Sequence, residues 1–141
     1  WNGLMKIVQE TSLMKKLTKF ISPLMKILFP KMKKEDKEYK EITINIIANL
    51  LGIGNAATPL GLKAMQTMQE KNPQKDKITD SMAMFIVLNT ASIQLIPSTV
   101  IAVRASLGSV NPSQIIVPVW IATIAADVAG IVASKILMKK F

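Results

Sequence analysis

The sequence contains neither cysteine nor histidine. These absences exclude disulfides, thiolate nucleophiles, metal sites built from Cys or His, and any catalytic triad with an imidazole base. An enzyme with this sequence would have to rely on Lys, Asp and Glu, and no spacing of Ser and Lys residues singles out a catalytic dyad. We therefore predict a protein that is not an enzyme and that holds no metal or other cofactor.

Aromatic and acidic residues are also scarce. Aromatics make up 5% of the 141 residues, whereas half are hydrophobic, so the apolar mass is aliphatic. Nine acidic residues face 18 basic ones, all but one of them lysines, and most lysines lie outside the most apolar runs. Such lysines are typical of the cytoplasmic flanks of membrane segments. The length suits one domain, residues 1–141, which we predict to be an all-α integral membrane domain that binds no nucleic acid.

The first segment, residues 1–29, has Leu, Ile, Val and Phe at helical spacing with lysines between them. A soluble amphipathic helix would show the same pattern. We favour a helix on or dipping into a membrane, because lysine side chains can reach the headgroups while the opposite face stays in hydrocarbon. The charged stretch 30–41 is expected to be a solvated loop on the cytoplasmic side.

Two short helices follow, predicted at 39–51 and from Thr58-Pro59 to about Glu70. Each has about 12 residues, or about 20 Å at 1.5 Å per residue, which is too short for a hydrocarbon core of about 30 Å. Between them lies Gly52-Ile53-Gly54-Asn55, and Thr58-Pro59 has the N-cap and first-position residues of a new helix. Basic loops lie at both outer ends, the first at residues 31–40 and the second at 71–77. The pattern therefore predicts a re-entrant hairpin with its tip at the break.

Residues 79–106 predict a helix broken near Pro97, because a proline removes one backbone hydrogen bond and clashes with the preceding turn. Thr90, Gln94 and Ser98 recur at every fourth position and are expected to share one helix face. The loop 107–114 is uncharged, whereas the C-terminal end is rich in lysine. The positive-inside rule therefore predicts that 79–106 crosses the bilayer as a broken helix and that the next helix returns.

The last helix is predicted from Asn111-Pro112 to Met138. Its residues 115–133 form a 19-residue run with one charge, the strongest membrane signal in the chain. Small residues recur there at four-residue spacing, as in transmembrane helices that pack closely: Ala122, Ala126, Gly130 and Ser134. A buried helix of a soluble bundle could carry the same stripe.

Three charged residues fall within apolar helices: Lys63, Arg104 and Asp127. Charges at membrane depth cost about 3 kcal/mol on insertion scales and usually face the protein interior. Lys63 and Arg104 lie near enough to helix ends to reach the interface instead. Asp127 lies deeper; it either forms a structural ion pair with Arg104 or Lys63, or couples a cation or binds a polar substrate.

The interruptions point most directly to a site. Irregular backbone at membrane depth is tolerated where protein or a water-filled cavity surrounds it, and paired interruptions often mark a transporter's binding site. We predict helix breaks at Gly52, Gly54, Pro59 and Pro97. The predicted substrate-binding side chains are Asn55, Thr58, Asn89, Thr90, Gln94, Ser98 and Thr99. The stretch GIGNAA is not a nucleotide loop, because it lacks the P-loop lysine and a preceding strand.

Two long motifs, NLLGIGNAATPLGLKAMQTMQ (49–69) and MFIVLNTASIQLIPSTVIAVRAS (84–106), closely resemble the spore maturation protein A family, which belongs to the nucleoside-recognition or Gate-domain membrane proteins. The opening WNGLMKIVQETSLMKKL resembles the same family, so the resemblance spans nearly the whole chain. The family has further hydrophobic sequence before this opening, which implies that the chain is truncated at its N-terminus.

The resemblance implies a multi-pass membrane protein of the sporulating bacterial cell that helps to dehydrate the spore core together with a related B-type partner. It implies a substrate site at the two breaks, with Asn55, Thr58 and Pro59 at one and Gln94, Pro97 and Ser98 at the other. Nucleoside binding is not carried over, because aromatic residues that could stack on a base are scarce.

Three functions stay open at this point. The chain is a transport or permeation component for a small polar or anionic solute, alone as a homo-oligomer or with its partner; or it is a membrane scaffold of spore assembly; or it is a helical bundle whose basic face binds anionic lipids. The long apolar run argues against the third.

Overall fold

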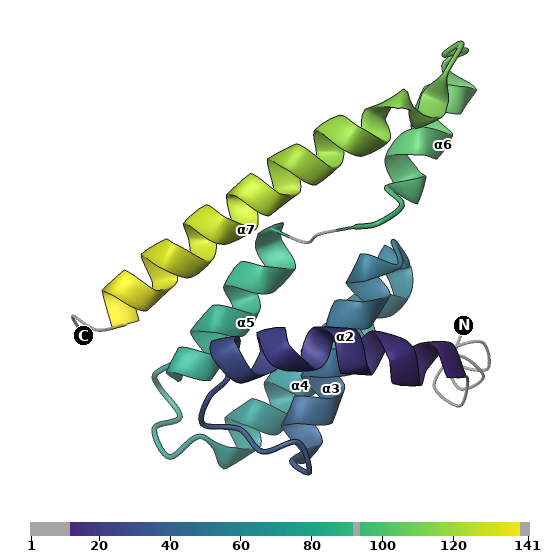
Figure 1. Ribbon diagram of the computed structural model, residues 1–141. Coiled ribbons are helices and arrows are strands. Elements are labelled where there is room, and N and C mark those ends of the chain that lie inside the picture. The colour runs from purple at the N-terminus through teal and green to yellow at the C-terminus, as the bar shows by residue number, and fades with distance from the viewer. Residues whose placement is uncertain (1–11, 92–93, 139–141) are drawn as a thin grey trace.

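The structure is a computed structural model that describes residues 12–91 and 94–138, all of its regular elements being helices. Figure 1 shows their arrangement. The helices are α2 (Ser12–Leu28), α3 (Lys37–Leu50), α4 (Gly54–Lys71), α5 (Asp80–Ala91), α6 (Ser98–Ser106), the short 3₁₀ turn η1 (Pro112–Ile115) and α7 (Ile116–Met138). The predicted all-α class is confirmed. The part of the predicted first helix before Ser12 lies outside the described residues.

Helices α3 and α4 form an antiparallel hairpin, the most extensive helix pair of the molecule. At its open end, the Lys71 ammonium donates hydrogen bonds to both carboxylate oxygens of Glu38, at 2.9 and 2.7 Å. The hydrogen bond to Glu38 raises the pKa of Lys71. Close packing along the hairpin depends on Gly61, because a Cβ there would lie 2.9 Å from Asn45 Nδ2.

The expected start of the second hairpin helix at Thr58-Pro59 is wrong, because α4 begins at Gly54 and runs through Pro59. Pro59 therefore does not break the helix, and Gly54 is its first residue. The helix tolerates the proline in its second turn, where the loss of one N–H affects only the carbonyl of Asn55. With 18 residues, α4 is longer than predicted.

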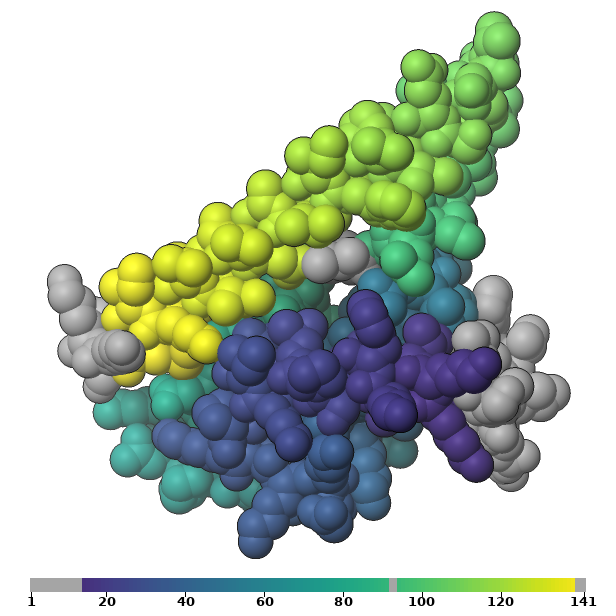
Figure 2. All heavy atoms as spheres, in the orientation of Figure 1, coloured from purple at the N-terminus to yellow at the C-terminus, as the bar shows by residue number. Residues whose placement is uncertain are grey.

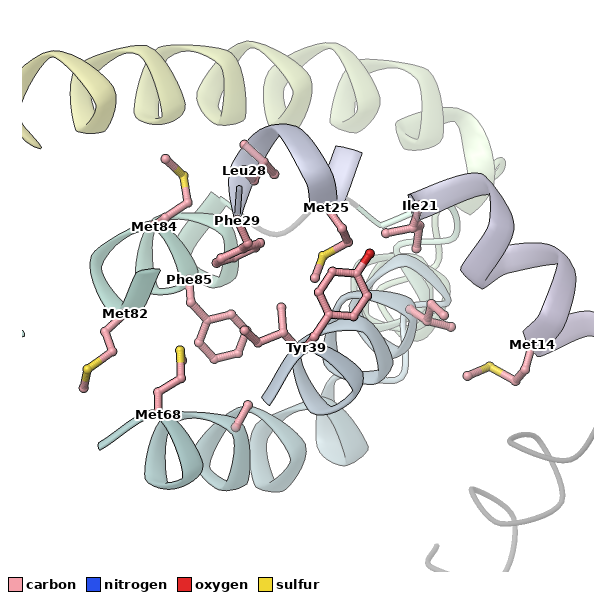
Figure 3. Packing of buried hydrophobic residues seen from close by; sticks show 13 residues of the cluster. Met14, Ile21, Met25, Leu28, Phe29, Tyr39, Met68, Met82, Met84 and Phe85 are labelled. Atoms are coloured by element: carbon pink, nitrogen blue, oxygen red, sulfur yellow. The ribbon is translucent and has the colours of Figure 1, made fainter. Parts of the chain in front are cut away.

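The buried core lies where α2, α3, α4 and α5 meet, and methionines supply much of it. Figure 3 shows Met25 and Phe29 above Tyr39, with Met68, Met82 and Phe85 closing the cluster from α4 and α5. Methionine is unbranched and adapts to irregular gaps, which suits helices that cross at several angles.

The second half of the chain forms a long antiparallel layer. Helices α5 and α6 run one after the other, with a non-helical stretch at 94–97, and α7 returns along them, as Figure 1 shows. The chain thus leaves the helix where the sequence predicted a break. For the same reason, Thr90, Gln94 and Ser98 do not share one helix face, contrary to the expectation from their spacing.

Among the described residues, one helix, Pro112–Met138, is long and apolar enough to cross a bilayer, with a mean hydropathy of 2.2 over its best window. Only 6% of that window is buried. In Figure 2 α6 and the first half of α7 project beyond the remaining helices. Large apolar side chains are exposed along both, including Val100, Val103, Ile121, Ile124 and Val128.

Basic segments gather at the opposite end of the molecule. Lys31 of the first basic loop lies 3.3 Å from Asp80 at the start of α5. The Lys135 ammonium of α7 donates to the carbonyl of Ile27 at 3.4 Å. The end of α2, the loop that follows it and the end of α7 therefore lie close together.

Candidate functional site: where two helix interruptions meet

The hairpin tip at 51–53 packs directly against the 94–97 interruption. The Leu95 N–H donates to the Leu50 carbonyl at 2.8 Å, and the Ser98 hydroxyl donates to the Gly52 carbonyl at 3.1 Å. Two segments about 45 positions apart in the sequence are thus joined by backbone polar groups. We call this contact the crossing.

Gly52 makes the crossing possible. Its φ is +71°, a left-handed conformation that costs other residues about 1–2 kcal/mol. A Cβ at this position would also overlap the carbonyl oxygen of Ile96. Both the local turn and the close approach of the second segment therefore require glycine.

Further backbone groups of the crossing also find partners within the protein. The Ile53 N–H donates to the Ala48 carbonyl at 3.0 Å, which closes the end of α3. On the other side, the Trp120 indole Nε1–H of α7 donates to the Leu95 carbonyl at 3.0 Å. Satisfied backbone groups are what irregular structure needs when it lies away from bulk water.

The crossing also brings helix ends together. Helix α4 begins at Gly54 and α6 begins at Ser98, next to each other because Ser98 bonds to Gly52. A helix N-terminus carries free N–H groups and about half a positive charge. Two such ends at one place favour an anion or the negative end of a polar molecule.

A cavity of about 370 Å³ lies beside the crossing, between α3, α4 and α5. Three of the predicted site residues, Thr58, Asn89 and Thr90, line it, together with Asn49. The volume falls in the range of small-molecule pockets, about 300–1,000 Å³.

A ladder of asparagines forms the polar side of this region. Asn45, which is fully buried, donates to the Ala57 carbonyl at 2.8 Å. Asn49 donates to Asn89 Oδ1 at 3.0 Å and so joins α3 to α5. We call Asn45, Asn49 and Asn89 the asparagine ladder. The sequence prediction missed Asn45 and Asn49, although their four-residue spacing within an apolar helix was a usable signal.

The other predicted site residues are less closely grouped. Gln94 is half-buried in the interruption, and Ser98 makes the crossing bond. Asn55 and Thr99 are exposed in the first turns of α4 and α6. Thr58 and Thr90 also bond to their own helices, to the carbonyls of Gly54 and Ile86.

The three charged residues that the sequence predicts at membrane depth, Lys63, Arg104 and Asp127, do not pair with one another. Lys63 lies 3.9 Å from Glu41, and Arg104 donates to Ser109 Oγ at 3.2 Å. Asp127 is buried on the face of α7 that packs on α5, with 5% of its surface exposed. Within the part of the chain that the structure describes, its Oδ1 has no hydrogen-bond partner. Among the described residues Asp127 forms no ion pair with Arg104 or Lys63, the pairing that was one of the expected alternatives.

Only part of the small-residue stripe of α7 packs against another helix of the described chain. Gly130 lies so close to Val87 of α5 that a Cβ would come within 2.8 Å of Val87 Cγ1, and Ser134 is buried. Ala122 and Ala126 are exposed, because a four-residue repeat drifts around the helix relative to its 3.6-residue turn.

Comparisons with known proteins bear on this site. Residues 1–107 match the family model described as nucleoside recognition, Gate. Over 135 residues the chain is 38% identical to the spore maturation protein A of Bacillus subtilis (strain 168), a match that covers 96% of this chain and 69% of that protein. No solved structure matches the chain. The region matched by the family model includes both interruptions and the asparagine ladder.

Proposed function

This chain belongs to the spore maturation protein A family of Gate-domain proteins, and from that premise we propose that it is a membrane permeation component of spore maturation. It passes a small polar or anionic solute during dehydration of the spore core, in a complex with a related B-type partner. It does so without catalysing a reaction and without a bound cofactor.

The crossing is the observation that carries this proposal. At the crossing, two helix interruptions are joined through a glycine in the left-handed conformation and a serine hydroxyl. In transporters, broken helices meet at the substrate site, and their N-termini face anionic groups of the substrate. The N-termini of α4 and α6 and the adjacent 370 Å³ cavity offer the same chemistry.

The proposal includes a membrane arrangement. The hairpin α3–α4 enters from the cytoplasmic side and turns back at residues 51–53, while α5 and α6 cross as one broken span and α7 returns. The grouping of Lys31, Lys71 and Lys135 at ends remote from the loop between α6 and α7 supports this arrangement, because the positive-inside rule then holds for each segment.

Accessibility of introduced cysteines tests the arrangement, since the chain has none of its own. Gln74→Cys places a single thiol at an exposed position in the basic loop between α4 and α5. Val110→Cys places one in the loop between α6 and η1. An impermeant thiol reagent should label Gln74→Cys from the cytoplasmic side and Val110→Cys from the opposite side of oriented membranes. Labelling of both thiols from the same side would show that α5 and α6 do not span the membrane.

A scaffold for spore assembly is the second candidate. The exposed apolar faces of α6 and α7 favour it, because such faces can pack against other membrane proteins as well as lipid. On this view the crossing serves only to hold helices together.

Complementation separates the two candidates. In B. subtilis lacking its own spore maturation protein A, variants of this chain would be scored by spore core water content and by protein level in the membrane. Asn55→Ala should abolish function at normal protein level if a polar site is present, whereas Gln66→Ala, an exposed position on the same helix, should not. Function retained by Asn55→Ala and by Gln94→Ala, with loss on Ala126→Leu, would favour the scaffold.

A further inference from the structure

A second and larger cavity, of about 770 Å³, lies on another side of the molecule, between α2 and α3. Five of its twelve lining residues are lysines, and no acidic residue lines it. The lysines are Lys15, Lys19 and Lys26 of α2, Lys34 of the basic loop and Lys40 of α3. The cavity therefore has a strongly positive wall.

The helix spacing explains why these charges converge. Positions 15, 19 and 26 differ by four and eleven residues, which places them on one face of α2. In the described part of the chain the ion pairs are made by other lysines, Lys31, Lys63 and Lys71. Among residues 12–91 and 94–138, the five ammonium groups thus surround one space with no carboxylate paired to them.

A buried donor in the same cavity also lacks a partner. The Tyr39 side chain is 5% exposed, and its hydroxyl has no hydrogen-bond partner in the described part of the protein. Figure 3 shows this hydroxyl pointing toward α2, between the buried side chains of Met25 and Ile21 at the edge of the core. A buried hydroxyl without a partner is costly, so a ligand atom that accepts a hydrogen bond is expected there.

Helix α2 presents a separate apolar face beside the cavity. Phe20, Leu24 and Ile27, at spacings of four and three, are 75%, 43% and 62% exposed. The core-facing residues, such as Met25, lie on a third face. A helix with an exposed apolar face next to a lysine face suits the membrane interface, where the apolar face enters the acyl region and lysines stay at headgroup depth.

We propose that the α2–α3 cavity binds the phosphate-bearing headgroup of an anionic phospholipid. The lysines of α2 and α3 hold the phosphate, the Tyr39 hydroxyl donates to one of its oxygens, and the acyl chains leave along the Phe20 face. Soluble phosphate offers the same charge but nothing for the apolar lining, to which Met14 and Ile44 contribute, nor for the exposed face of α2. The site lies apart from the crossing and is independent of the solute proposed above.

Native mass spectrometry of the full chain in detergent tests this site, with phosphatidylglycerol and phosphatidylcholine as probes. Each lysine near a lipid phosphate contributes about a fivefold gain in affinity. The variant Lys19→Gln/Lys26→Gln should therefore bind phosphatidylglycerol about 25-fold more weakly. The matched control Lys16→Gln/Lys77→Gln removes the same charge from positions that do not line the cavity and should change binding less than about threefold.

A second variant, Tyr39→Phe, removes only the unpartnered hydroxyl. It should weaken phosphatidylglycerol binding several-fold while thermal stability stays equal or rises, because no hydrogen bond to the described residues is lost. A purely structural role of Tyr39 would leave lipid binding unchanged.

Three results would overturn the proposal. Equal affinity for the two lipids would remove headgroup recognition, and equal losses in the lysine variant and its control would leave only general charge attraction. Displacement of phosphatidylglycerol by millimolar inorganic phosphate would identify a soluble anion as the ligand instead.

Discussion

Replacing Gly52 by alanine should separate the two interruptions. The left-handed φ of +71° costs alanine about 1–2 kcal/mol. The new Cβ would overlap the carbonyl oxygen of Ile96, which is backbone and cannot rotate away, and such overpacking costs about 1–3 kcal/mol. We therefore expect Gly52→Ala to destabilise the protein by about 2–5 kcal/mol.

Replacements of two other glycines separate the conformational cost of the positive φ from the cost of the steric overlap. Gly108 has a φ of +77° but open space at its Cβ, so Gly108→Ala should carry only the conformational cost of about 1–2 kcal/mol. Gly54 has neither a positive φ nor a neighbour within 4 Å, and its replacement should leave stability unchanged or raise it slightly.

Thermal unfolding in detergent or nanodiscs measures the difference. At about 3 °C per kcal/mol for a chain of this size, Gly52→Ala should lower the Tm by about 6–15 °C and Gly108→Ala by about 3–6 °C. In the complementation assay, Gly52→Ala should lose function, whereas the Gly54 and Gly108 variants should keep it. Equal Tm values for the Gly52 and Gly108 variants would refute the close approach of the two interruptions, and with it the crossing.

Three further predictions concern polar and charged side chains, two of them near the site and one at the open end of the hairpin. Alanine replacements of Asn49 and Asn89, alone and together, should give a coupling energy of about 0.5–1.5 kcal/mol in a double-mutant cycle of unfolding; additive effects would argue against their hydrogen bond. Asp127→Asn should keep or raise the Tm but abolish any pH dependence of solute flux, and unchanged pH dependence would remove this carboxylate from coupling. Lys71→Met should lower the Tm at pH 7. Because the hydrogen bond to Glu38 raises the Lys71 pKa above its ordinary 10.5, this stabilisation is complete at neutral pH and should disappear only as the pH rises well beyond that value; a constant Tm difference in alkali would argue against the pair.

Much of the helical layout could be predicted because its signals are local. The N-terminal amphipathic pattern, the glycine at the hairpin tip and the proline at 97 each act within a few residues. The same reasoning placed the start of α4 at Pro59, five residues later than Gly54. It took Thr58-Pro59 as the cap and first position of a new helix, although a helix can accept proline within its first turns.

The crossing and the asparagine ladder depend on contacts that no local signal encodes. Asn49 and Asn89 are 40 positions apart, and Leu50 and Leu95 are 45 apart. Their pairing depends on how the hairpin packs on α5, where Met68, Met84 and Phe85 belong to the shared core. Sequence spacing could identify each interruption but not that one glycine carbonyl would meet one serine hydroxyl.

Helix α7 contacts the crossing and also carries the buried carboxylate of Asp127. The indole of Trp120 covers the Leu95 carbonyl, while Asp127 lies buried two turns further along the same helix, against α5. Movement of α7 along its axis would therefore uncover the interruption and change the surroundings of the carboxylate at once. In the permeation function proposed above, α7 would link the carboxylate to the exposure of the interruption. Trp120→Phe, which keeps the packing but removes the indole donor, should accordingly raise solute leak without lowering protein level; unaltered leak would leave α7 a purely structural helix.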